Sequence, residues 1–127
     1  MNEETKIQNQ QLLALSDAGC IVWRVETAGA WVGKVIHKER DTVTLSGARM
    51  IQAGITKGGS DIIGIVPTVI TPDMVGQTLG VFLAGEVKTR SGRPSKEQLN
   101  FIQRVNEAGG IAGIARSPQE ALDLISR

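Results

Sequence analysis

The stretch "KGGSDIIGI", residues 57–65, places one acid, Asp61, between a glycine pair and a short apolar run. A short apolar run bounded by turn residues is typical of a buried strand. A carboxylate beside such a strand is costly to bury unless it is paired, hydrogen-bonded or bound to a metal. The sequence therefore predicts that Asp61 has a partner elsewhere in the chain.

A second apolar run, "LGVFLAGEVK" at residues 79–88, ends in charged residues. Side chains two apart on a strand share a face, so Glu86 and Lys88 point the same way and Val87 points to the opposite layer. If the two strands are neighbours, Asp61 and Glu86 converge at one end of the sheet. Two carboxylates are hard ligands for Mg²⁺ or Mn²⁺, and a lysine beside them suits phosphodiester hydrolysis. The alternative interpretation is an ordinary ion pair at a strand end.

The remaining segments predict helices and strands around these two runs. A helical stripe marks residues 2–19, two strand-like runs flank the turn "KERD" in residues 30–47, and "IAGIA" at 111–115 is typical of a buried strand. Ser95 with Gln98, and Ser117 with Glu120, predict capping boxes at two helix starts. We expect one domain, residues 1–127, of the α/β class, with a central mixed β-sheet flanked by helices in the order α-β-β-β-α-β-α.

Composition narrows the class of protein. The chain has 127 residues, one cysteine and a formal net charge of +1, which excludes histone-like wrapping of nucleic acid but not a local basic patch. The lone Cys20 cannot form an intramolecular disulfide, and no run resembles a signal peptide or a membrane span. We therefore expect a reducing, cytoplasmic compartment. "GITKGG" lacks the spacing of a phosphate-binding loop, so no nucleotide cofactor is expected.

At this point the chain resembles a known family. "GGSDIIGI" and "GEVKTRSGRPSKEQLNFIQRVNEAGGIAGIARSPQEAL" are similar to the VRR-Nuc branch of the PD-(D/E)xK nucleases. The resemblance implies a restriction-endonuclease-like core that cuts DNA with Mg²⁺ or Mn²⁺, in a bacterial or phage-infected cell. It further implies that Asp61, Glu86 and the Val87 carbonyl are metal ligands and that Lys88 is the catalytic lysine. Small stand-alone members act as homodimers on branched DNA such as four-way (Holliday) junctions.

Two further site candidates combine pattern and resemblance. The family has an acid on the first helix in a Glu-x-x-x-Gln pattern, which fits Glu4 and Gln8. Periodicity also places Glu4 on the inward stripe, so we favour it as the acid that the resemblance implies to be a metal ligand. Glu3 remains a competitor, and a first-turn glutamate interacting with the helix dipole is the structural alternative. Gln98 is explained by its capping box, although the family places a glutamine here near the active site.

The segment "KTRSGRPSK", residues 88–96, has four basic residues and no acid. Because it follows Glu86 directly, we expect it to hold DNA phosphates, whereas in an unknown protein such a loop is usually only solvated. The DNA-binding candidates are Arg24, Lys57, Ser60, Arg90, Arg93 and Lys96. Lys34, Lys38 and Arg40 extend this track or face a second subunit, two alternatives that the sequence leaves open.

Two functional hypotheses follow. The first is a metal-dependent DNA endonuclease that acts as a homodimer on branched DNA. The second is a non-catalytic DNA-binding or assembly subunit that keeps a nuclease scaffold. The retained acids and lysine favour the first, and a cleavage assay separates the two.

Overall fold

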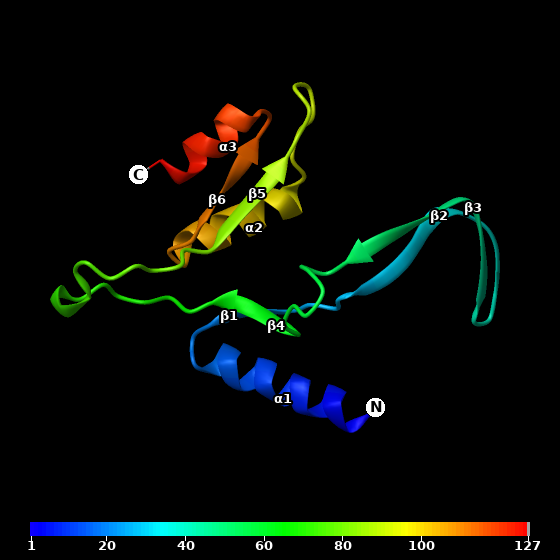
Figure 1. The fold of residues 1–127 in the computed structure, drawn as a ribbon, viewed down its shortest axis with the longest axis horizontal. Helices are drawn as coiled ribbons and strands as arrows, with labels where there is room; N and C mark the ends of the chain where they lie inside the picture. Colours follow the sequence, from blue (N-terminus) through cyan, green and yellow to red (C-terminus); the bar gives the residue numbers. More distant parts are fainter. Residues whose placement is uncertain (127) are drawn as a thin grey trace. The chain divides into compact units, whose positions relative to one another are not determined.

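The computed structural model describes residues 1–126. The chain divides into two units, one formed by Trp23–Ile63 and the other by Met1–Val22 with Gly64–Arg127. In chain order (Figure 1), the elements are α1 Glu3–Asp17, β1 Ile21–Arg24, β2 Ala28–Glu39, β3 Thr42–Ala53, β4 Ile62–Ile65, the 3₁₀ turn η1 Pro72–Met74, β5 Leu83–Val87, α2 Lys96–Glu107, β6 Ile111–Ala115 and α3 Pro118–Ile125. The fold is mixed α/β as expected, with three helices, but five strands lie between α1 and α2 where the predicted order α-β-β-β-α-β-α has three.

The sheets are smaller than the sequence suggested. We expected one central mixed sheet in which the strands of Asp61 and Glu86 are neighbours. In residues 1–126, the structure instead describes two-stranded sheets that pair β1 with β4, β2 with β3 and β5 with β6. A strand can hydrogen-bond along two edges. In each of these two-stranded sheets, a strand is paired along one of its edges. The expected single sheet is therefore not what the described pairings form.

Each helix begins at the kind of residue that satisfies free backbone N–H groups. Asn2 caps α1, and Ser95 and Gln98 form the predicted capping box of α2. Ser117 caps α3, but the predicted second box is wrong in one detail: Glu120 accepts from the backbone N–H of Arg116 instead of from the cap residue. No helix in residues 1–126 combines the length and apolar character needed to cross a membrane.

The parallel strands β5 and β6 form a small layer between two helices (Figure 1). Ala84 and Glu86 pair with residues of β6 on the face that α2 covers. On the opposite face, Gly113 lies against Leu124 of α3 so closely that an added Cβ would collide with it. Val105 of α2 is fully buried and anchors the packing of this helix. The helices therefore cover opposite faces and fix the direction in which Glu86 points.

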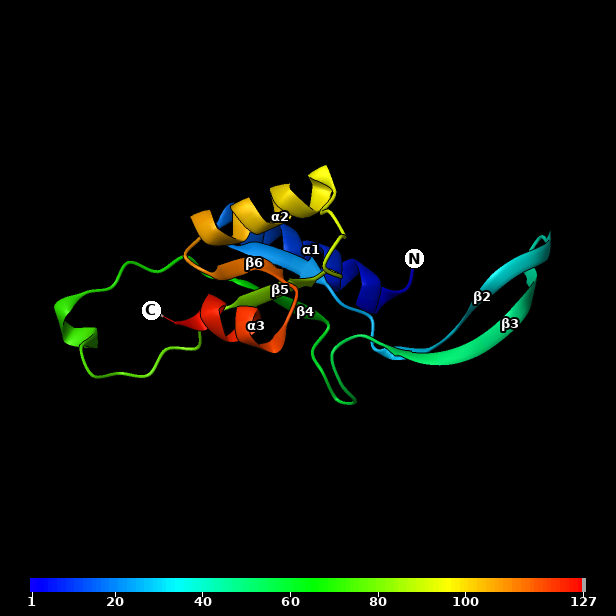
Figure 2. The same cartoon turned by 90° about the horizontal axis from the view of Figure 1, so that it is seen from above.

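Strands β2 and β3 form a long antiparallel hairpin, which Figure 2 shows as a curved ribbon. The predicted hairpin is confirmed and is longer than the segment 30–47 that indicated it. The turn contains Arg40 at a positive φ of 49°, a region that non-glycine residues enter mainly in tight turns. Two register shifts interrupt the ladder, between Val32 and Lys34 and between Val35 and His37. Such bulges increase local twist, which accounts for the curvature.

Candidate functional site

The clearest cluster of polar side chains lies at the end of β5. Glu86 and Lys88 share a face as predicted, with the Lys88 Nζ atom 3.6 Å from the Glu86 Oε1 atom. Val87 lies on the other face with 82% of its surface exposed. The side-chain amide of Gln98 donates a 2.7 Å hydrogen bond to the same Glu86 oxygen. Glu86, Lys88 and Gln98 are therefore brought together as one half-buried group.

Gln98 does two things at the start of α2, and they depend on each other. Its Oε1 atom accepts a 2.8 Å hydrogen bond from the Ser95 backbone N–H, which completes the capping box. Its Nε2 atom donates to Glu86. A side-chain amide has both an acceptor and two donors, so one residue can fill both roles. The capping and active-site interpretations of Gln98 are thus compatible.

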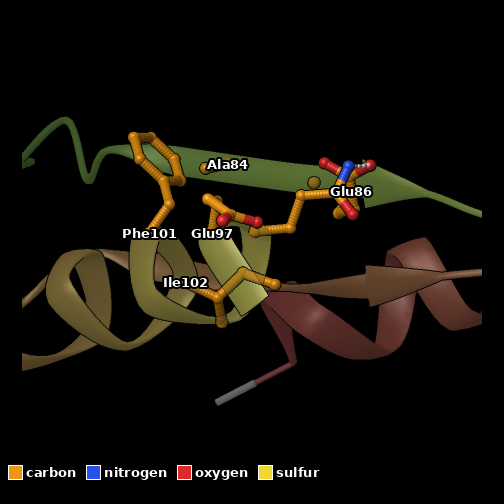
Figure 3. Close-up of a pocket in the computed structure, with 7 residues that line it drawn as sticks. Ala84, Glu86, Glu97, Phe101 and Ile102 are labelled. Carbon is orange, nitrogen blue, oxygen red and sulfur yellow. Dashed lines mark hydrogen bonds between the residues drawn. The ribbon is translucent and has the colours of Figure 1, made fainter. Parts of the chain in front are cut away.

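A pocket of about 320 Å³ lies between β5 and α2. Figure 3 shows Phe101 and Ala84 toward one end and Glu86 toward the other, with Glu97 between strand and helix. Glu97 was not among the sequence candidates. It could have been found as a first-turn acid of the helix that follows the Glu-x-Lys strand. The pocket therefore has two carboxylates near an apolar wall.

The loop of residues 88–95 has hydrogen bonds within itself and one from Arg116. The Gly92 N–H donates to the Thr89 carbonyl oxygen over 3.1 Å. The guanidinium of Arg116, which follows β6, donates a 2.9 Å hydrogen bond to the Gly92 carbonyl oxygen. Arg90 and Arg93 remain exposed in this loop. Arg116 was missed by sequence reasoning, although a cation directly after the last buried strand was the available signal.

Lys96 is also exposed and begins α2. Together with Arg90 and Arg93 it gives the unit containing Glu86 a group of solvent-accessible cations. Arginine and lysine side chains of this kind bind phosphate groups through charge-assisted hydrogen bonds. The loop therefore has the composition and the exposure that phosphate binding requires.

Asp61 was expected beside a buried strand as a buried acid, and the structure places it at the surface. Asp61 is exposed and directly precedes β4. Within residues 1–126, no charged side chain is buried. The backbone explains its position, because the Asp61 carbonyl oxygen accepts a 2.8 Å hydrogen bond from the Val25 N–H. Asp61 belongs to the unit Trp23–Ile63, whereas Glu86 belongs to the other unit. The expectation that Asp61 is a buried acid is therefore wrong.

The first helix also departs from its predicted burial. Glu4 is exposed, and the half-buried positions of α1 are Thr5, Gln8 and Leu12. The expectation that Glu4 lies on the inward stripe is therefore wrong, while Gln8 does lie there. Glu3 and Glu4 both occupy the first turn, where negative charge is favourable beside the positive helix end. The structural alternative for Glu4 accordingly accounts for its position.

The remaining DNA-binding candidates all lie in the unit Trp23–Ile63. Arg24, at the end of β1, forms a 3.3 Å ion pair with Glu26. Lys57 and Ser60 are exposed in the segment between β3 and β4. An ion pair between two exposed side chains is weak, so it leaves Arg24 able to exchange Glu26 for a phosphate.

Residues 1–126 contain no group of three or more His, Cys, Asp or Glu side chains arranged to hold a metal. The oxygen donors that the sequence nominated are distributed over α1, the residue before β4, and β5. Glu86 is the best oriented of them, because its Oε1 atom interacts with Gln98 and Lys88.

Comparison of the chain with protein-family models, with curated proteins and with solved structures found no match.

Proposed function

We propose that this protein is a Mg²⁺- or Mn²⁺-dependent endonuclease that hydrolyses phosphodiester bonds of DNA, with branched DNA such as four-way junctions as its substrate. The observation that carries the proposal is the Glu86–Gln98–Lys88 cluster at the end of β5. It joins a fixed carboxylate to a lysine beside a loop with exposed Arg90 and Arg93. The resemblance to VRR-Nuc nucleases, with their restriction-endonuclease-like core, supports the same conclusion.

The proposed ligand atoms suit a hard divalent cation, because all of them are oxygen atoms. Glu86, Asp61 and the Val87 carbonyl would hold the ion, with Glu4 as a further ligand. When bound, the ion would supply Lewis-acid polarisation of a phosphate oxygen and a more acidic water.

The protein's own side chains would perform the remaining tasks. Gln98 holds the Glu86 carboxylate in one orientation through its 2.7 Å hydrogen bond. The Lys88 ammonium, 3.6 Å from the same oxygen, would position the attacking water or offset negative charge that develops at the phosphate. Arg90, Arg93 and Lys96 would bind flanking phosphates and so fix the register of the strand.

A homodimer fits a four-way junction better than one small domain does. Twofold symmetry supplies two equivalent sites, one for each strand that must be cut. We therefore propose that the functional form is a homodimer, without a membrane or nucleotide partner.

The test uses labelled linear, flap, splayed and four-way DNAs with Mg²⁺ or Mn²⁺ and with EDTA as the control. Lys88→Ala should reduce cleavage by about a hundredfold or more, the size typical of losing one group that stabilises transition-state charge. Lys6→Ala, an exposed change on α1, should leave cleavage unchanged. Electrophoretic mobility shifts measured on the same DNAs should remain similar for all three proteins.

Two results contradict the proposal. Undiminished cutting by the Lys88→Ala protein would remove Lys88 from the mechanism. Binding to DNA without metal-dependent cleavage of any substrate in the panel would instead support the non-catalytic DNA-binding subunit.

A further inference from the structure

The β2–β3 hairpin has exposed apolar side chains that neither strand can cover. Trp31 and Met50 are directly opposite each other and are 63% and 53% exposed. A two-stranded hairpin is at best marginally stable in water without another surface against its apolar face. The hairpin therefore calls for a specific partner.

The register places five apolar residues of the hairpin, Trp31, Val35, Val43, Leu45 and Met50, on one face. Trp31 pairs with Met50, Val35 with Leu45, and Lys38 with Val43. The first register shift adds its extra residue to β3, so β2 keeps its regular alternation there. Trp31 and Val35 are four residues apart on β2, an even number, and therefore lie on the same face. The second register shift adds its extra residue to β2, so β3 keeps its regular alternation there. Leu45 and Val43 are two residues apart on β3 and therefore lie on the same face. These six residues are called the apolar hairpin face.

The opposite face has different chemistry. It is mixed: Ala30 pairs with Ile51, Arg49 with Val32, Lys34 with Ser46, His37 with Thr44, and Glu39 with Thr42. The same alternation places these residues away from Trp31 and Val35. An acidic partner such as nucleic acid would bind the cations of this second face. The apolar hairpin face contains no carboxylate and, as its single cation, Lys38 near the turn, so electrostatics favours an uncharged partner there.

We propose that the apolar hairpin face binds the same face of a second copy of this chain. A face with so little charge is complementary to itself, as an interface across a twofold axis must be. If the two hairpins run in opposite directions, the two copies of Lys38 lie at opposite ends and do not repel each other. Lys34 and Arg49, on the opposite faces of both hairpins, then remain available to DNA phosphates.

The size of the face indicates a dimer of moderate affinity. A two-stranded ribbon of this length, at ~3.4 Å per residue, presents on the order of 400 Å² per copy. Stable interfaces bury ~800 Å² per partner, and weaker ones bury less. A face this small is at the low end of specific interfaces, so the hairpins alone should form a weak dimer, and we expect dissociation in the micromolar range. The proposal supplies the interface that the proposed nuclease dimer needs, but it does not depend on catalysis.

Sedimentation velocity of the full chain without DNA tests the proposal with a matched pair of variants. Val35→Lys places a charge on the apolar hairpin face and should weaken dimerisation by about tenfold or more, because that charge would be buried without a partner. Thr44→Lys adds the same charge to the opposite face and should leave dimerisation unchanged. Trp31→Ser, which adds no charge, should weaken the dimer as Val35→Lys does. Circular dichroism of each protein confirms that it has folded.

Three results would overturn the interface. One is a wild-type chain that stays monomeric at ~100 µM, well above a micromolar dissociation constant. Another is an undiminished dimer in both the Val35→Lys and Trp31→Ser proteins. The third is a Thr44→Lys dimer that dissociates as readily as the Val35→Lys dimer does. A cleavage assay separates this failure from that of the proposed function: an active monomer overturns only the interface, whereas an inactive dimer that Val35→Lys dissociates overturns only the nuclease.

Discussion

The β5–α2 region and the β2–β3 hairpin satisfy their side chains in opposite ways. In the first, Val105 is fully buried, Gln98 caps its helix, and Glu86 has defined neighbours. In the second, Trp31 and Met50 face solvent. A region whose polar and apolar groups find partners inside the chain can hold a reactive geometry. A region whose groups lack such partners is suited to bind another molecule.

The largest expected difference between the two regions is in stability. Val105→Ala should lower the free energy of unfolding by about 2 kcal/mol, from lost apolar burial and the cavity left behind. Val43→Ala, at a residue that is 48% exposed on the hairpin, should change it by less than about 0.5 kcal/mol. Urea denaturation of dilute protein measures both changes in the free energy of unfolding. The comparison requires that the variants have the same m-value as the wild type. Equal losses would show that the hairpin is as tightly packed as α2.

A smaller effect should follow from the cap of α2. Ser95→Ala removes the hydroxyl that accepts from the Gln98 N–H over 3.1 Å, and it should lower the free energy of unfolding by about 1 kcal/mol. Ser16→Ala, an exposed change in α1, is the control and should have almost no effect. Because Gln98 also orients Glu86, cleavage should fall in the Ser95→Ala protein as well. Unaltered stability in that protein would show that the capping box contributes little.

Local patterns predicted the elements of this fold well. Gly19 marked the end of α1, the Ser95–Gln98 spacing marked the start of α2, and the turn "KERD" marked the hairpin. Each signal acts over a few residues, so the sequence alone is enough to find it. The same is true of Glu86 and Lys88, whose common face follows from strand alternation.

Burial was predicted less well, because it depends on residues distant in the sequence. Asp61 was expected beside a buried strand and is exposed, and Glu4 was expected on an inward stripe and is exposed. Glu97 and Arg116 were missed because the pocket that Glu97 lines, and the hydrogen bond from Arg116 to the loop 88–95, form only when β5, β6 and α2 pack together. The pairing of β4 with β1 likewise depends on tertiary context that a short apolar run does not encode.

The central proposal, which the resemblance to VRR-Nuc nucleases implies, is that Asp61 and Glu86 are ligands of one divalent cation. Calorimetric titration of Mn²⁺ into wild type, Asp61→Asn, Glu86→Gln and the double variant tests it most directly. We predict that each single substitution weakens binding by about tenfold or more, since affinity depends on the number of charged ligands. The double variant should lose much less than the sum of the two, because the residues act on the same ion. Wild-type affinity in the Asp61→Asn protein would contradict the account.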